Sequence, residues 1–355
     1  LSAPVSFAVH SIMSHWSWVD LPCVARFIRR CSPDAVLLIF TDRDYDYHPM
    51  IMFAPLVSKL LAPRATFVTQ LETQFLSRKV SVITQASLKI AARCLGPDRL
   101  DYAYGTLVCG SDRVILLSED HREKFSDTFA KAKNKIAVLP PPPMIRVVDS
   151  DEGLRQRGRD CLGVKPQDFL LAYFGYIYPD KGLETLLKAL ALVKKRRSNV
   201  RLVMIGASLG AAHASSYLAT IHKLADESGV RDDILWTGEY EPDSDQPSMC
   251  LRAADACVLP FDHGVTLNRS SVAASAAHGL PIITTRGEKI ESPFEDRKNV
   301  LLCSPRNPQR VAAAVEEVIA DAELRNRLRR GALDLARQFF NWETTVSRTI
   351  EALGA

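Results

Sequence analysis

Several features are missing from this chain of 355 residues, and each absence narrows what the protein can be. No run of about 18 or more uncharged apolar residues is present, which argues against a transmembrane helix. The first residues lack the basic, apolar and small-residue order of a signal peptide. The eight cysteines include no C-x-x-C pair and no His partner at metal-ligand spacing, so we expect reduced, buried thiols in a cytoplasmic protein and no metal site.

A strong net charge is also lacking, because the formal charge at pH 7 is only +4. Residues 1–145 contain 17 Lys and Arg against 13 Asp and Glu, whereas the remainder contains 28 of each, so the whole excess lies in the first half. We expect that half to meet anionic material, and we expect no nucleic-acid partner.

Residues 75–95 place apolar side chains at near-helical spacing, with basic residues between them. A basic amphipathic helix of this kind lies on an anionic membrane surface, or it packs on one side and is solvated on the other. Both interpretations stay open. The first predicts a peripheral location at the inner membrane surface.

Apolar runs alternate with helical periodicity along both halves of the chain, which is typical of parallel sheets flanked by helices. In the first half we expect strands at 3–10, 34–40, 65–70, 113–118 and 136–139, and helices at 18–30, 50–61, 75–95 and 119–130. In the second half we expect strands at 169–174, 200–205, 234–237 and 255–260, and helices at 183–197, 214–228, 270–278, 308–320, 323–339 and 342–353. The sequence therefore predicts an α/β fold.

Four consecutive prolines at 140–143 cannot continue a helix or a central strand, so we expect a stiff connector there. We place an N-terminal domain at 1–143, a C-terminal domain at 144–340, and a C-terminal helix at 341–355 that crosses back to the N-terminal domain. Two α/β sheets joined by a proline hinge suggest a cleft between the domains.

The most informative stretch is 255–285, where an apolar strand leads through a polar loop into an Ala-rich helix that ends at Gly279. Ser270 and Ser271 are the N-cap candidates. A strand, a polar loop and a helix N-terminus together can seat an anion, because unpaired N–H groups and the positive dipole end face the loop. We interpret the stretch as a phosphate site. An ordinary strand–loop–helix connection is the alternative.

Two further loops follow expected strands. The loop at 174–182 offers Gly175 for close backbone approach and Lys181 as a point charge for a phosphate, although it lacks the P-loop pattern and an exposed surface lysine is the plainer interpretation. Gly206 opens the second loop. Because the carboxyl ends of parallel strands share an edge, we expect these loops to gather with residues 268–271.

At these positions the chain carries a family resemblance. It resembles retaining, nucleotide-sugar-dependent glycosyltransferases of group one, in the clan of glycogen synthase, which have the GT-B fold of two Rossmann-like domains facing a central cleft. The residues that carry the resemblance are Phe174-Gly175, Pro179-Asp180-Lys181-Gly182-Leu183-Glu184, Val200 to Gly206, Ala254-Asp255-Ala256 with Val258-Leu259-Pro260, and Ala277 to Ile283. The match is specific over 168–345 and weaker over 34–140.

The resemblance implies hexosyl transfer from a nucleoside diphosphate sugar, held by the second domain, to an acceptor hydroxyl on the first. It places such an enzyme in polysaccharide, glycolipid or natural-product biosynthesis. It also implies no metal and no cofactor, so protein groups must neutralise the departing diphosphate. Lys181 matches the family's phosphate-binding lysine, and a preformed positive site there stabilises the charge that grows on the leaving group.

The chain departs from the family pattern at three residues of its second half and again near its N-terminus. Tyr176 stands where a basic residue is common, and Thr266 and Ala274 stand where the family has two glutamates eight positions apart. We therefore expect Asn268, Arg269, Ser270 and Ser271 to contact the diphosphate, with Arg269 supplying the missing positive charge. No glycine-rich loop precedes Trp16, so either the start is missing or the acceptor site is built differently.

Three further residues have open roles. Glu72 lies near a His position that the family uses at the reacting face, and it accepts a hydrogen bond from the acceptor or the sugar, or only caps the next helix. His263 meets the donor sugar or is polar surface. Glu241 lies where relatives hold the nucleoside, and we expect it to contact the ribose.

Two alternatives to the transferase have the same architecture. A nucleotide-sugar epimerase needs acid–base residues that the identified loops scarcely contain. A binding protein that has lost catalysis is supported by the uncharged Thr266 and Ala274.

Overall fold

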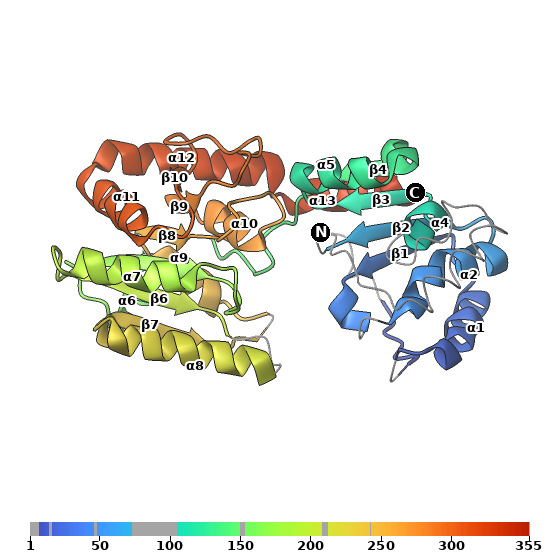
Figure 1. The fold of residues 1–355 in the computed structure, drawn as a ribbon, viewed down its shortest axis with the longest axis horizontal. Coiled ribbons are helices and arrows are strands. Elements are labelled where there is room, and N and C mark those ends of the chain that lie inside the picture. The colour runs from blue at the N-terminus through green and yellow to red at the C-terminus, as the bar shows by residue number, and fades with distance from the viewer. Residues whose placement is uncertain are drawn as a thin grey trace. The chain divides into compact units, whose positions relative to one another are not determined.

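The computed structural model describes residues 7–13, 16–45, 48–72, 105–149, 153–207, 212–241 and 243–354. The chain divides into two compact units (Figure 1). The N-terminal unit ends at Leu139 and regains the chain from Val346 onward, and the C-terminal unit runs from Pro140 to Thr345. The chain therefore passes between the units twice, at the start of the proline run and within its last helix.

The N-terminal unit contains a parallel sheet in which the four described strands follow chain order. The strands are β1 (Ala35–Phe40), β2 (Thr66–Leu71), β3 (Arg113–Leu116) and β4 (Ile136–Val138). The described helices are η1 (Trp18–Asp20), α1 (Leu21–Cys31), η2 (Asp42–Tyr45), η3 (Pro49–Phe53), α2 (Ala54–Leu61), α4 (Gly105–Gly110), α5 (Glu119–Thr128) and η4 (Ala130–Lys135).

Alternation along the strands divides this unit's core between the two faces of the sheet. Val114 and Leu116 pack on one face among residues of α4 and α5. Ile115 packs on the other face with Val68 of β2 and with Ala352 of α13 (Trp342–Leu353), the last helix of the chain. The end of α13 therefore completes the core of the N-terminal unit.

Several local expectations for the first half are confirmed, and one is wrong. The Ser118 hydroxyl caps α5 by accepting a hydrogen bond from the His121 N–H at 3.2 Å. Residues 7–10, however, are not in a strand, although they belong to the apolar run that predicted one. The helix expected at 75–95, with its membrane interpretation, lies outside the described residues.

The C-terminal unit contains a six-stranded parallel sheet in the order β10-β9-β8-β5-β6-β7. The strands are β5 (Phe169–Phe174), β6 (Val200–Ile205), β7 (Ile234–Gly238), β8 (Ala256–Leu259), β9 (Ile282–Thr285) and β10 (Leu301–Cys303). The helices are α6 (Leu154–Cys161), α7 (Leu183–Lys194), α8 (Ala212–Glu227), η5 (Arg231–Asp233), α9 (Gln246–Ala253), α10 (Ser270–Ala277), α11 (Pro308–Ala320) and α12 (Ala322–Phe339).

Helices cover both faces of this sheet, because the chain winds outward in two directions from its centre. Helix α7 packs against α8 and α11, while α6 packs against α9 and α10 against α12. The strands are buried on both faces and read as near-continuous apolar runs, which is why the sequence located β5 and β6 to the residue. The α/β fold with two parallel sheets is confirmed.

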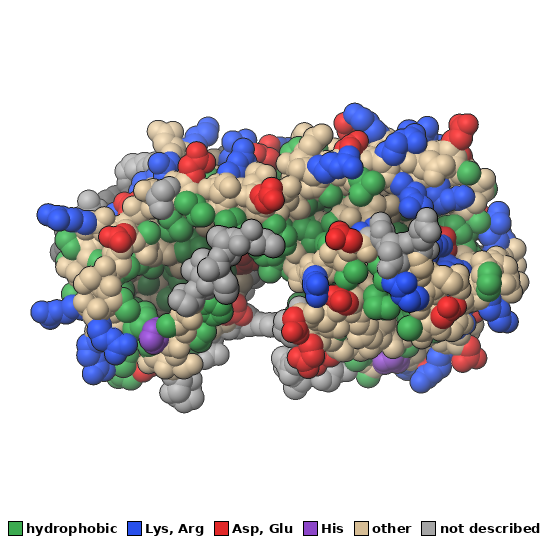
Figure 2. Space-filling view, turned by 180° about the vertical axis from the view of Figure 1, so that it is seen from behind, with side chains coloured by type: hydrophobic (Ala, Val, Ile, Leu, Met, Phe, Trp, Pro, Cys, Tyr) green, Lys and Arg blue, Asp and Glu red, His purple; other side chains and the backbone are tan. Residues whose placement is uncertain are grey.

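On the face drawn in Figure 2, basic and acidic side chains are interspersed over the C-terminal unit. No helix in the described part of the chain is long and apolar enough to cross a membrane. No disulfide joins the seven described cysteines, but Cys31 and Cys161 are exposed, so the expectation of buried thiols is wrong at these two positions.

Candidate functional site

The candidate site lies where β5 and β8 are neighbours at the centre of the second sheet. From β5 the chain continues to β6 and β7 on one side, and from β8 to β9 and β10 on the other. The order of the strands thus reverses between these two, and open α/β sheets bind ligands in the crevice at such a switch point, between the loops that leave the carboxyl ends of the two strands. These loops are 175–182, after β5, and 260–269, after β8.

Glycines allow the loops at this edge to approach one another closely. Gly206 has a φ of 129°, and a Cβ atom there would overlap the carbonyl oxygen of Gly175, whose own φ is 136°. Gly182, with a φ of 71°, is the N-cap of α7, and a Cβ atom there would overlap the carbonyl oxygen of Pro260. The loop after β5 thus touches the loops after both β6 and β8.

Lys181 is buried within this edge, so the interpretation as an exposed surface lysine is wrong. Its Nζ lies 4.8 Å from the ring centroid of Tyr178 and 5.4 Å from that of Phe261. Burial, and secondarily the positive charge of Arg269, lowers the pKa of Lys181 from 10.5 to about 7. An amine in this state gains much from an incoming anion.

Arg269 lies on the same aromatic ring, with its Cζ 4.7 Å from the centroid of Phe261. Its Nε is buried without a hydrogen-bond partner. Burial lowers the pKa of this guanidinium, and the nearby Tyr178, Tyr173 and Asp180 oppose that effect. The structure thus brings together the two cations that the sequence analysis selected, and it leaves donor capacity on Arg269 unused.

Helix α10 begins beside these cations, but its cap differs from the prediction. Arg269, not Ser270 or Ser271, occupies the N-cap position, and no side chain caps the helix, because the extended backbone turns into the helix one residue earlier than expected. The Ser271 hydroxyl is buried without a hydrogen-bond partner. The first N–H groups of a helix have no intrahelical acceptor. They and this hydroxyl are therefore available to an anion.

Thr266 and Ala274 occupy the two positions where the family resemblance would place glutamates, and neither side chain is charged. The Thr266 hydroxyl donates to Asn268 Oδ1 at 2.5 Å, and Ala274 is fully buried inside α10. A carboxylate does lie beneath this loop, since Glu291 is 8% exposed and its Oε2 accepts a hydrogen bond from the Leu267 N–H at 2.7 Å. Sequence spacing could not reveal Glu291, which comes 24 residues later.

Three other residues predicted from the sequence, His263, Tyr176 and Glu241, are exposed to solvent. His263 Nε2 is 3.7 Å from Asp180 Oδ1, and both side chains are 65% exposed. Tyr176 is exposed, while its carbonyl accepts a hydrogen bond from the Tyr173 hydroxyl at 3.0 Å. Glu241 is exposed. All three predicted residues belong to the C-terminal unit, but none makes a contact that fixes a role.

Glu72 belongs to the N-terminal unit, directly after β2. Its N–H donates to the Phe40 carbonyl at 3.0 Å, and its carboxylate accepts a hydrogen bond from the Gln70 side chain at 2.5 Å. The carboxylate therefore has a local partner at the carboxyl edge of its own sheet. Phe261 and Tyr178, by contrast, touch the cations of the C-terminal unit, although nothing in the sequence marked either residue as part of a site.

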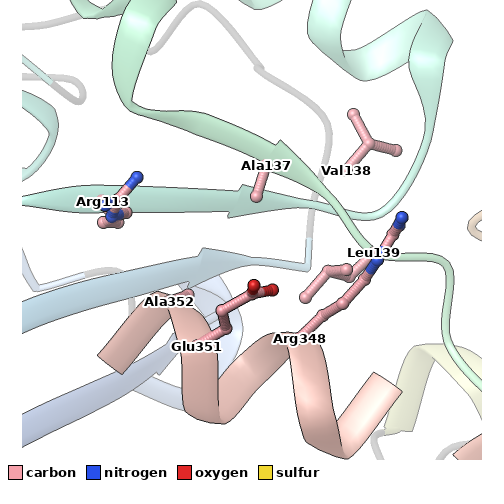
Figure 3. A pocket seen from close by; sticks show the side chains of 7 residues that line it. All are labelled: Arg113, Ala137, Val138, Leu139, Arg348, Glu351 and Ala352. Carbon is pink, nitrogen blue, oxygen red and sulfur yellow. The ribbon is translucent and has the colours of Figure 1, made fainter. Parts of the chain in front are cut away.

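A hollow of about 370 Å³ lies elsewhere, in the N-terminal unit beside α13 (Figure 3). Its charged lining comes from Arg113 of β3 and from Arg348 and Glu351 of α13, around an apolar floor that includes Leu139 and Ala352. No residue selected from the sequence lines it. It therefore plays no part in the candidate site.

Comparison with known proteins decides the family. The family model described as "Glycosyl transferases group 1" matches residues 155–334, which is half of the chain and includes both loops of the crevice. The chain belongs to this family. Solved structures agree in fold: a protein from Anabaena, HepE, crystallised with UDP and glucose, superposes with a TM-score of 0.69 at 18% identity over 97% of this chain and 84% of that one. The GT-B fold is thereby confirmed.

Curated relatives are more similar in sequence. A D-inositol 3-phosphate glycosyltransferase from Thermomonospora curvata is 26% identical over 76% of this chain and 64% of its own length. A GDP-mannose-dependent alpha-(1-6)-phosphatidylinositol monomannoside mannosyltransferase from Mycobacterium tuberculosis is 27% identical over 69% of this chain and 62% of its own length. The group 1 chain thus spans less than two thirds of the length of either relative.

Proposed function

We propose that this group 1 protein is a retaining glycosyltransferase that moves a hexosyl group from a nucleoside diphosphate sugar to an acceptor hydroxyl, without a metal or cofactor. The observation that carries the proposal is the pair of cations, the buried Lys181 and the half-buried Arg269, gathered on Phe261 at the switch point of the sheet. Buried charges are costly unless something compensates them. The diphosphate of a nucleotide sugar carries two negative charges, which would compensate both cations.

The chemistry of the leaving group fits this arrangement. As the bond from the sugar to the diphosphate breaks, negative charge grows on the phosphate oxygens, so fixed positive groups stabilise the transition state more than the ground state. Lys181 supplies a point charge, Arg269 a fork of N–H donors, and the first turn of α10 free backbone N–H groups. Each such contact is worth about 3 kcal/mol of barrier.

The relatives support the choice of donor class. The curated relative from Mycobacterium tuberculosis is named as GDP-mannose-dependent, and the Anabaena structure holds UDP. GDP-mannose and UDP both contain the diphosphate that the two cations would hold. In our proposal Glu241 contacts the ribose, His263 the donor sugar, and Thr266 and Asn268 line the same loop, while Gly175, Tyr176 and Gly206 let the backbone come close to the phosphates.

The acceptor in our proposal binds the N-terminal unit, where Glu72 accepts a hydrogen bond from the acceptor hydroxyl or from the transferred sugar. We propose a polysaccharide, glycolipid or natural product as the acceptor class, with peripheral membrane contact through the basic N-terminal half. The relatives' names, which include an inositol phosphate and a phosphatidylinositol mannoside, support a hydroxyl-bearing acceptor that also carries a phosphate.

A second candidate is a nucleotide-sugar-binding protein without transferase activity. Thr266 and the buried Ala274 favour it, because the carboxylates that the family resemblance would place there are missing. Incubation with nucleoside diphosphate sugars separates the two: transfer or slow donor hydrolysis supports the enzyme, binding with neither supports the binding protein, and isomerised sugar would indicate an epimerase.

The first experiment is a thermal-shift screen with UDP, GDP, ADP, TDP and CDP, followed by calorimetric titration of the best ligand. We expect Lys181→Ala and Arg269→Gln each to weaken nucleoside diphosphate binding by about 10- to 100-fold, because each removes a charge-assisted contact worth about 1.5 to 3 kcal/mol. Lys188→Ala, at an exposed position on α7, is the matched control. Unchanged affinity in both site variants would refute the proposed diphosphate site.

A further inference from the structure

Two like charges share one aromatic ring in the C-terminal unit. Lys181 Nζ lies 5.4 Å from the Phe261 ring centroid, and Arg269 Cζ lies 4.7 Å from it. The ring is fully buried, Lys181 is buried and Arg269 is half-buried. Such a pair repels itself, so something other than solvent must hold the two groups together.

Acidic side chains are nearby but are directed to other partners. Asp180 Oδ1 lies 3.7 Å from His263 Nε2, and Asp262 Oδ2 lies 3.5 Å from Arg306 Nε. In the described part of the chain, no salt bridge joins Lys181 or Arg269 to a carboxylate. The negative face of an aromatic ring attracts a cation without accepting its hydrogen bonds. Phe261 therefore compensates the charges and leaves their N–H donors free.

The backbone around Phe261 fixes the ring at the end of β8. The Phe261 N–H donates to the Leu259 carbonyl at 3.0 Å. The Phe261 carbonyl accepts hydrogen bonds from the Thr285 hydroxyl at the end of β9 and from the Gly264 N–H. A ring held by two adjacent strands is a rigid platform, and rigid support is what an anion site needs to hold two cations at a fixed spacing.

We propose that Phe261 is a positioning residue that holds Lys181 and Arg269 side by side, with their donors free, for the two phosphates of a nucleoside diphosphate. The proposal rests on the proposed function, because it assumes that the crevice binds such a ligand. Phe261 itself touches neither phosphate. It acts through the two cations, and Tyr178, whose ring centroid is 4.8 Å from Lys181 Nζ, supports Lys181 from its own loop.

The test compares Phe261→Leu, which keeps apolar bulk but removes the π face, with Phe261→Tyr, which keeps that face. Titration calorimetry measures the Kd of each variant for two ligands. One is the nucleoside diphosphate that best stabilises the wild type, and the other is the corresponding unphosphorylated nucleoside. We expect Phe261→Leu to weaken diphosphate binding about tenfold and to leave nucleoside binding unchanged. Phe261→Tyr should stay within about twofold of wild type. Phe340→Leu, at a buried position at the end of α12, controls for loss of packing.

A double-mutant cycle with Arg269→Gln separates positioning from general packing. If Phe261 acts through the cations, Phe261→Leu should weaken diphosphate binding less in the Arg269→Gln background than in the wild type. Equal affinity of wild type and Phe261→Leu would overturn the inference, as would an equal loss of nucleoside and diphosphate binding. If the wild type binds no nucleoside diphosphate, the proposed function itself fails, and this result is distinct from the other two.

Discussion

Lys181 is a buried amine whose protonation depends on its neighbours. Without an anion beside it, burial and the positive charge of Arg269 set the pKa of Lys181 at about 7, so the amine loses its proton as the pH rises through neutrality. A diphosphate bound beside Lys181, as proposed above, would favour the charged form and raise this pKa again. Binding of the anion and binding of a proton by Lys181 are therefore linked.

This linkage predicts that nucleoside diphosphate affinity falls as the pH rises from 7 to 9. Above the pKa of the free protein, Lys181 must take up a proton when the ligand binds. This requirement raises the Kd by up to about tenfold for each pH unit. Calorimetric titrations in buffers of different ionisation enthalpy would also detect the proton uptake. In Lys181→Arg the guanidinium stays charged throughout, so its Kd should not follow the pH. A wild-type Kd that is constant from pH 7 to 9 would contradict this prediction.

At the scale of elements, the loops that follow β5 and β8 are held together through Gly182. This residue combines a φ of 71° with a position where any side chain would overlap the carbonyl of Pro260. Gly182→Ala should destabilise the protein by about 2 to 4 kcal/mol, from the left-handed conformation and from overpacking, and should weaken nucleotide binding by displacing Lys181 from Phe261. Equilibrium unfolding and calorimetric titration measure the two effects.

Gly163→Ala provides the control for this change. Gly163 has a similar φ of 62°, but nothing lies within 4 Å of a Cβ atom placed there. It should cost only about 1 kcal/mol, and nucleotide binding should not change. If both variants lose the same stability and neither loses affinity, the contact between Gly182 and Pro260 does not position the site.

The elements that the sequence predicted best are the central strands. Each is a short apolar run that leads into a glycine-bearing loop, which is typical of a buried strand. Helix α6 was missed, because it is short, half of its residues are charged, and it gains its stability from tertiary contacts. Arg159, for example, is buried and donates to the carbonyls of Lys165 and Asp168 at 2.8 and 2.7 Å. Periodicity shows amphipathic faces but not hydrogen bonds of this kind.

The sequence could indicate only part of the candidate site. Charge and loop position selected Lys181 and Arg269, because the topology of a parallel sheet gathers the loops that follow its strands. Phe261 was missed, since an apolar residue directly after a strand looks like part of the core. Only the distances from its ring to the two cations distinguish it from other buried phenylalanines.

At the scale of the whole molecule, one helix belongs to both units. Near its start in the C-terminal unit, Trp342 Nε1 donates to the Pro143 carbonyl at 3.0 Å. At its end, Ala352 is buried against Val68, Ile115 and Leu139 of the N-terminal unit. The two units have separate hydrophobic cores. A change at the end of α13 should therefore disturb one core and spare the other.

Ala352→Asp tests this separation. A carboxylate on that buried face loses its hydration, and Arg113 and Arg348, which line the same hollow, offset part of this cost. The change should therefore cost about 2 to 3 kcal/mol, lowering the unfolding midpoint of the N-terminal unit by roughly 4 to 12 °C. Ser347→Asp adds the same charge at an exposed position of α13 and should have little effect. Hydrogen exchange locates the change: amides of β2, β3 and β4 should lose protection, while those of β5 to β10 keep it. Equal loss of protection in both sheets would mean that the units unfold as one, because α13 then couples their cores instead of merely joining them.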